Sequence, residues 1–230
     1  MDTVKHLLNK IYGDETGKLA LRRLAPMIER FPAVPRPKKE FFSQEDVVLI
    51  TYGDSLQKAG QAPIATLHEF AANYLKGAVS TVHFLPFFPY SSDDGFAVMD
   101  FSAINPELGT WEDVKAIGNE FELMFDYVVN HFSSRSQWFA RYLAKESGYE
   151  EFAIEVDPGA DLSMVTRPRS LPLLSEYEKI DGQKVHVWTT FSADQIDFNF
   201  KSLDVLTKMV EVLLLYVQNG ARILRQDAIA

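Results

Sequence analysis

The chain has 230 residues, of which 47% are hydrophobic and 24% are charged, as expected for a soluble globular protein with one large core. Its net charge of −9, without a basic patch, excludes nucleic acid as an expected partner and leaves any anion site to a few local arginines. The lack of cysteine excludes disulfides, thiolate nucleophiles and cysteine-bound metals.

The first 45 residues predict a helical extension that ends in a linker. Apolar residues at helical spacing indicate two short helices within residues 3–31, and neither has the apolar length of a signal peptide or a membrane span. A proline- and lysine-rich stretch over residues 31–42 predicts a linker without regular structure. We therefore expect a cytoplasmic protein with no membrane partner.

Residues 46–147 alternate between strand and helix patterns. The apolar run 47–52 predicts a strand buried on both faces, and residues 64–77 carry a helical pattern. The series continues with strands over 80–88 and 121–129 and helices over 111–119 and 134–147. Strands and helices that alternate at this spacing predict parallel βαβ units, and hence an α/β fold.

The rest of the chain divides into an irregular segment and a last helix and strand. Residues 148–202 contain several prolines, glycines and scattered aromatics, and a connection of this length predicts an inserted subdomain. Residues 203–219 then predict a helix and residues 221–225 a fourth strand.

Polar side chains cluster directly after three of the predicted strands. The carboxyl ends of parallel strands meet on one rim, which is where α/β barrels build their active sites. The candidates are Asp93 and Phe96 after the second strand, Asp126, Asn130 and His131 at the third, and Arg225 and Asp227 at the fourth.

Each cluster taken alone also has a structural interpretation. The segment Ser-Ser-Asp-Asp-Gly is a good turn sequence, Asn130 could cap a helix, and His131 could be a satisfied core histidine. Arg225 and Asp227 share one strand face and could form a simple ion pair, but the same pairing keeps a carboxylate nucleophile ionised and aimed. Three clusters on one rim favour the functional interpretation.

Three motifs carry a resemblance to a known family. DYVVNH (126–131), QIDFNF (195–200) and GARILRQDA (220–228) occur in the order and spacing of glycoside hydrolase family 13, the α-amylase superfamily. ITYGDSL, LPFFPYSSDDGF and VTRPRSLPLL are similar to its sucrose phosphorylase subgroup. The N-terminal extension, with SSDDGF and TTFSADQIDFN, is more similar to the glucosylglycerate phosphorylases of that subgroup.

The resemblance implies the N-terminal half of a (β/α)8 TIM barrel with a small domain inserted after the third strand. The expected parts are the helical extension and linker (1–45), barrel strands one to three with their helices (46–147), the inserted subdomain (148–202), and the helix and strand four of a truncated barrel (203–230). Such a half-barrel leaves an open sheet edge that would allow self-association.

The resemblance also implies a retaining enzyme that transfers a glucosyl group from an α-glucoside to phosphate through a covalent glucosyl-enzyme. For glucosylglycerate, the products would be glucose 1-phosphate and glycerate. Inorganic phosphate is then a co-substrate, and neither a metal nor another cofactor is implied. The implied roles are nucleophile for Asp227, its ionising partner for Arg225, glucosyl binding for Asp93, Phe96 and His131, phosphate binding for Arg169 with Arg167 as a weaker candidate, and support for Asp126 and Asn130.

Two other functions stay open at this stage. The protein could be a sucrose phosphorylase or another glucosidase or transglucosidase of the family, or the truncated chain could be a noncatalytic sugar-binding module. The family's acid/base glutamate lies on a fifth strand and a stabilising aspartate follows a seventh, so we expect this chain alone to be inactive. Gln226, where relatives usually carry an apolar residue, is expected to be buried, at a cost of about 1–3 kcal/mol if it lacks partners.

Overall fold

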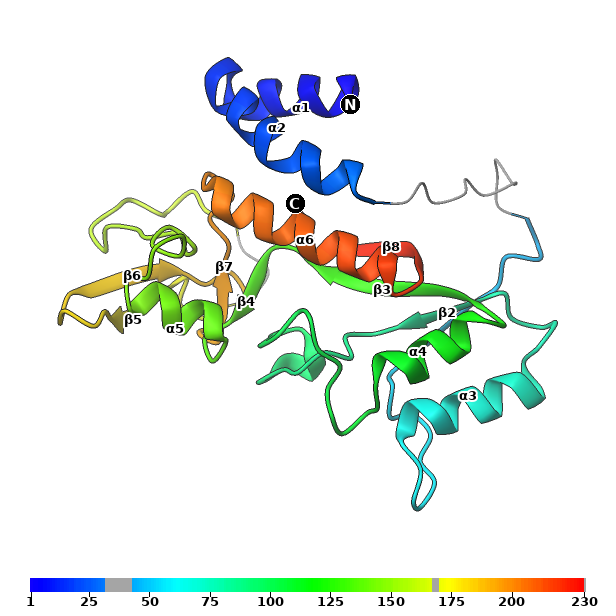
Figure 1. Cartoon of the computed structure of the whole chain (residues 1–230). Helices are drawn as coiled ribbons and strands as arrows, with labels where there is room; N and C mark the ends of the chain where they lie inside the picture. Colours follow the sequence, from blue (N-terminus) through cyan, green and yellow to red (C-terminus); the bar gives the residue numbers. More distant parts are fainter. Residues whose placement is uncertain (32–42, 167–169, 230) are drawn as a thin grey trace.

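The computed structural model describes residues 1–31, 43–166 and 170–229. Most of the predicted linker, together with the candidates Arg167 and Arg169, therefore lies outside the described residues. Figure 1 shows a pair of N-terminal helices, a parallel sheet with its helices, and a smaller insertion built from short strands and one helix.

A four-stranded parallel sheet forms the centre of the molecule. Its order is β1-β2-β3-β8, so the strands succeed one another across the sheet as they do along the chain. The strands are β1 (Val48–Thr51), β2 (Thr81–Phe84), β3 (Glu122–Val128) and β8 (Ala221–Asp227), each within or overlapping its predicted position. This α/β sheet is the one predicted for the first half of a barrel.

Three helices connect these strands and cover one face of the sheet. They are α3 (Pro63–Tyr74), α4 (Trp111–Gly118) and α6 (Leu203–Gln218). The start of α4 is fixed by a capping box, in which the Thr110 side chain accepts from the backbone N–H of Asp113 and the Asp113 carboxylate accepts from that of Thr110.

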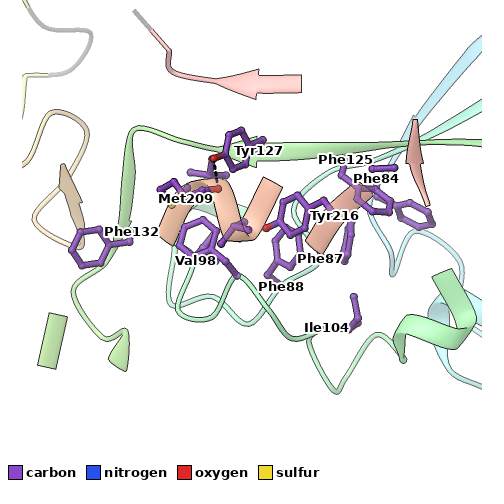
Figure 2. Close-up of a cluster of buried hydrophobic side chains, with 14 of the residues drawn as sticks. Phe84, Phe87, Phe88, Val98, Ile104, Phe125, Tyr127, Phe132, Met209 and Tyr216 are labelled. Carbon is purple, nitrogen blue, oxygen red and sulfur yellow. Dashed lines mark hydrogen bonds between the residues drawn. The ribbon is translucent and has the colours of Figure 1, made fainter. Parts of the chain in front are cut away.

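The core between the sheet and these helices is rich in aromatic side chains (Figure 2). Phe84 of β2 and Phe125 and Tyr127 of β3 point into this core. The residues between them along each strand therefore point to the other face of the sheet. The Tyr216 ring of α6 stacks on Phe88 with centroids 4.9 Å apart, and the Tyr127 hydroxyl of β3 donates to the Met209 carbonyl of α6 at 2.7 Å. These contacts fix α6, and through it the start of β8.

The opposite face of the sheet is only partly covered within the described residues, since His83 on it is 2% exposed and Ile50 is 62% exposed. One row across it contains Ile50, His83, Met124 and Ile223 in direct register. The prediction that the first strand is buried on both faces was wrong, because β1 is an edge strand and Ile50 is 62% exposed. Gln226 on the other edge strand is also exposed, so the expected cost of burying its amide does not arise here.

The insertion contains more regular structure than its composition suggests. The predicted segment 148–202 contains β5 (Leu174–Glu178), β6 (Lys184–Trp188) and β7 (Gln195–Asp197). β4 (His131–Ser133) and α5 (Gln137–Leu143) precede that segment in the chain, and we describe them with the insertion because β4 pairs with β7. β5 and β6 form an antiparallel hairpin, and β4 pairs antiparallel with β7. Because β4 begins three residues after β3 ends, this pairing attaches the insertion directly to the rim of the sheet.

The N-terminal extension folds as α1 (Asp2–Tyr12) and α2 (Asp14–Glu29) and packs against α6 (Figure 1). Leu8 and Leu24 form a small separate core with Leu203 at the start of α6. The Tyr12 hydroxyl donates to the Phe200 carbonyl at 2.8 Å, and Arg23 pairs with an aspartate of α6. In the part of the chain that is described, no helix combines the length and apolar character needed to cross a bilayer.

Two buried tyrosines of this core allow a matched stability test. The Tyr216 hydroxyl is buried and finds no hydrogen-bond partner among the described residues, whereas the Tyr127 hydroxyl has one. We expect Tyr216→Phe to raise the free energy of unfolding by about 1 kcal/mol and Tyr127→Phe to lower it by about 1 kcal/mol. Urea unfolding measures both, and a destabilised Tyr216→Phe protein would contradict this description of the core.

Candidate active site

A pocket of about 290 Å³ lies at the carboxyl end of the sheet, at the lower limit of the volumes of small-molecule sites. It combines carboxylates with aromatic walls, the composition expected of a site that binds a polar ring. Its lining residues are Tyr52, Asp93, Asp94, Phe96, His131, Phe191, Gln195 and Asp227.

An ion-pair network joins the two strands that bear the acidic residues. Asp126 of β3 lies opposite Arg225 of β8 in the parallel register, and the guanidinium donates to Oδ1 of Asp126. The same guanidinium lies 3.2 Å from Oδ1 of Asp227, two residues further along β8. The Asp126 side chain is fully buried and that of Asp227 is 19% exposed. Arg225 therefore binds a buried carboxylate through Nη1 and a carboxylate of the pocket through Nη2.

Arg225 is predicted to keep Asp227 ionised, but other groups oppose its effect on the pKa of that carboxyl. Burial raises the pKa of the Asp227 carboxyl above its ordinary value, the Arg225 charge lowers it, and the charges of Asp126 and Asp93 raise it again. The net pKa shift is upward. Arg225 therefore offsets only part of the burial, because Asp126 takes a share of its charge.

A strained loop carries Asp93 into the pocket. The short 3-10 turn Asp93–Gly95 follows β2, and its residues have φ values of 55°, 51° and 104° in sequence order. Two consecutive non-glycine residues in the left-handed region are uncommon and are typical of functional loops. Gly95 is required as glycine, because a Cβ atom there would lie 2.8 Å from the Pro86 carbonyl oxygen.

Gln195 and His131 form the floor of the pocket. The Gln195 amide donates to Oδ2 of Asp93 at 2.9 Å, and its Nε2 lies 3.1 Å from Nε2 of His131. Nε2 of His131 is also 3.1 Å from the carbonyl oxygen of Phe96. Both side chains are buried, and the pairing of β4 with β7 brings them together.

Asn130 serves the insertion rather than the pocket lining. Its carbonyl accepts the N–H of Phe198 at 2.9 Å, and its side-chain amide is hydrogen-bonded to the Asp197 carboxylate. Burial is the main influence on Asp197 and raises its pKa, while hydrogen bonds from Thr190 and Asn130 oppose the shift.

Asp194 fastens three segments of the site to one another. Its carboxylate accepts hydrogen bonds from four serine hydroxyls at 2.5–3.3 Å, two in the loop after β2 and two at the end of β4. The donors are Ser91, Ser92, Ser133 and Ser134. Because Asp194 directly precedes Gln195, this cluster holds the Asp93 loop against both pocket-floor residues.

The structure brings most of the sequence-predicted residues together. Asp93, Phe96, His131 and Asp227 line the pocket, Arg225 and Asp126 lie behind Asp227, and Asn130 lies beside His131. Arg169 is outside the described residues. The roles predicted for these residues remain predictions.

Sequence reasoning missed four lining residues, Tyr52, Asp94, Phe191 and Gln195. Two of them had a signal, since Tyr52 ends the first apolar run and Gln195 begins the motif QIDFNF. Asp94 was part of the turn sequence, and nothing in the pattern around Phe191 distinguishes it from a core aromatic.

Comparison with known proteins adds a family to this geometry. The family described as "Alpha amylase, catalytic domain" matches residues 71–230. A glucosylglycerate phosphorylase of Spirochaeta thermophila is 49% identical over 100% of the chain and 40% of its own length, and one of Escherichia coli is 44% identical over 96% of the chain and 40% of its own length.

A solved structure is similar as well. The sucrose 6F-phosphate phosphorylase of Thermoanaerobacter thermosaccharolyticum superposes with a TM-score of 0.74 at 32% identity, over 82% of this chain and 41% of that one. The chain thus spans about 40% of the length of these relatives.

The serine cluster around Asp194 predicts a pH-dependent loss of stability. Partial burial would raise the pKa of this carboxyl, but the hydrogen bonds from Ser134, Ser91, Ser92 and Ser133 outweigh it and lower the pKa. We expect Asp194→Asn to lower the free energy of unfolding by about 1–3 kcal/mol at pH 7, because the amide replaces an acceptor oxygen with a donor.

The sign of the pH effect follows from the lowered pKa. The stabilisation by the Asp194 carboxylate is present above the unfolded pKa of about 3.9 and is lost as the pH falls through the folded value. The difference in free energy of unfolding between the wild type and Asp194→Asn should therefore become smaller as the pH is lowered from 7 to 3. Glu107→Gln, at an exposed carboxylate, is the control and should change the free energy of unfolding by no more than about 0.5 kcal/mol. If the difference between the wild type and Asp194→Asn stays constant with pH, the stabilising role of the Asp194 carboxylate is refuted.

Proposed function

The chain belongs to the family of the α-amylase catalytic domain, and on that premise we propose that it carries the nucleophile half of the active site of a glucoside phosphorylase. The observation that supports this most directly is Asp227 at the carboxyl end of β8, paired with Arg225 and facing Asp93 across one pocket. A carboxylate held in this way at the rim of a barrel strand is suited to attack a sugar carbon.

In the first half-reaction an Asp227 oxygen attacks C1 of the bound α-glucosyl group. The new bond joins C1 to the carboxylate, and the bond from C1 to the leaving oxygen breaks with its electron pair on that oxygen. The leaving oxygen takes a proton from a general acid, which the resemblance assigns to a fifth barrel strand and thus to a region outside the four-stranded central sheet.

In the second half-reaction a phosphate oxygen attacks C1 of the glucosyl ester. The bond between C1 and the Asp227 oxygen breaks, the carboxylate is regenerated, and the phosphate proton returns to the same acid/base group. Two inversions at C1 give α-glucose 1-phosphate. Asp93, His131 and Gln195 would bind the sugar hydroxyls, and Phe96 would contact the ring.

The donor we propose is glucosylglycerate, with phosphate as the second substrate and glycerate as the leaving group. The support is the 49% and 44% identity to two glucosylglycerate phosphorylases across the N-terminal extension as well as the barrel strands. Among sucrose-type relatives, the similar solved structure reaches only 32%.

A chimeric enzyme tests this function. The 230-residue chain replaces the matching N-terminal 40% of the Spirochaeta thermophila relative, and the readout is glucose 1-phosphate formed from phosphate with either glucosylglycerate or sucrose. We expect turnover with glucosylglycerate in the chimera and none in the 230-residue chain alone. Preferred turnover of sucrose would refute glucosylglycerate as the donor, and activity of the 230-residue chain would refute the assignment of the general acid to a fifth barrel strand.

Asp227→Asn in the same chimera should abolish glucosyl transfer, with a loss of at least about 10⁴-fold in kcat, because the amide cannot form the covalent ester. Asp204→Asn is a matched control on α6, where the aspartate pairs with Arg23 far from the pocket, and it should retain full activity. Retained turnover in Asp227→Asn would remove Asp227 as nucleophile.

Arg169 remains the proposed phosphate ligand on sequence grounds. We expect Arg169→Ala to raise the KM for phosphate about tenfold or more while the hydrolysis of the glucosyl donor changes little, since a charge-assisted contact to the anion is lost. Arg167→Ala is the neighbouring control and should have the smaller effect. An unchanged KM for phosphate in Arg169→Ala would exclude this residue from the site.

A further inference from the structure

We propose that His83 is a positioning residue for the nucleophile, acting on Asp227 through Asp126 and Arg225. The inference rests on the proposed function, in which Asp227 reacts with the sugar. His83 lies within β2, in a run of apolar residues that gave no sign of a site.

Four side chains are connected by successive polar contacts. Nε2 of His83 lies 2.9 Å from Oδ2 of Asp126, whose other oxygen, Oδ1, accepts from Arg225. The other terminal nitrogen of Arg225, Nη2, lies 3.2 Å from Oδ1 of Asp227. His83 is 2% exposed and Asp126 is fully buried, so water does not replace the contact between them.

The position of His83 in the sheet argues against a packing role. The residues in register with His83 on the two neighbouring strands are Ile50 and Met124, and both are apolar. An apolar side chain would therefore suit this row. A histidine that is buried there and hydrogen-bonded to a carboxylate costs desolvation that an isoleucine or methionine would avoid.

What His83 adds is a donor on the second oxygen of Asp126. With one donor on each oxygen, the plane of the Asp126 carboxylate is fixed, and so is the direction from which Arg225 leaves it toward Asp227. The His83 N–H also draws negative charge away from Oδ1 of Asp126, the oxygen that Arg225 binds. This contact should therefore lower the repulsion between Asp126 and an ionised Asp227.

Kinetics in the chimera separate positioning from folding. We expect His83→Met, of similar volume, to lower kcat about tenfold to a hundredfold with little change in the KM for the donor, because a group that orients a reacting residue is lost. His83→Gln should recover most of the rate, since its Nε2 can donate to the same Asp126 oxygen. If both variants turn over like the wild type, or if Gln is no better than Met at equal thermal stability, the proposal is overturned.

Nuclear magnetic resonance of the 230-residue chain tests the same link without any activity. At pH 7 we expect Nε2 of His83 to carry its proton, and we expect His83→Met to raise the pKa of the Asp227 carboxyl further. The other titratable or charged groups around Asp227 are unchanged in the variant; they are Arg225, Asp126, Asp93, Asp94, His131 and Tyr52. An unprotonated Nε2 in the wild type, or an unchanged Asp227 pKa in the variant, would overturn the proposal.

The two experiments keep the two claims apart. A wild-type chimera without glucosyl transfer contradicts the proposed function, while the resonance measurements on the short chain still decide whether His83 acts on Asp227. A His83→Met protein that does not fold leaves the wild-type proton at Nε2 and the rate of His83→Gln as deciding results.

Discussion

The ion pair between Arg225 and the buried Asp126 is the constraint on which the rest of the site depends. A fully buried carboxylate is tolerated only if it is paired and hydrogen-bonded, and here the donors come from the two neighbouring strands, β2 and β8. The Arg225 side chain is 42% exposed, but without its guanidinium the fully buried Asp126 carboxylate would lose one of its two donors. The pair therefore fixes the register of β8 against β3, and that register places Asp227 in the pocket.

A second layer of polar contacts holds the loops that complete the pocket. Asp194 collects four serine hydroxyls from two segments, and Gln195 beside it reaches both Asp93 and His131. The left-handed backbone at Asp93 and Asp94 is costly on its own, and this layer over-determines it. The upward pKa shift of Asp227 fits the same view, since the fold accepts an unfavourable carboxylate at the position where chemistry is proposed.

The sheet and its helices could be predicted from the sequence because short apolar runs alternate with segments of helical period, and the three polar clusters do meet on one rim. The exposure of Ile50 could not be predicted, because a β-branched run does not reveal whether its strand lies at an edge. The roles of Asp194 and His83 depend on contacts between residues 43 to 103 positions apart, which no local pattern contains.

Trapping of the covalent intermediate tests the central claim most directly. The chimera is incubated with 5-fluoro-α-glucosyl fluoride, whose fluoride leaves with little help from an acid and whose ring fluorine slows breakdown of the ester. Peptide mass spectrometry then locates the sugar. The account predicts one fluoroglucosyl group on the peptide that contains Asp227, linked to that side chain. A sugar linked to Asp93 or Asp126 instead, or no adduct on a protein that still turns over glucosylglycerate, would contradict it.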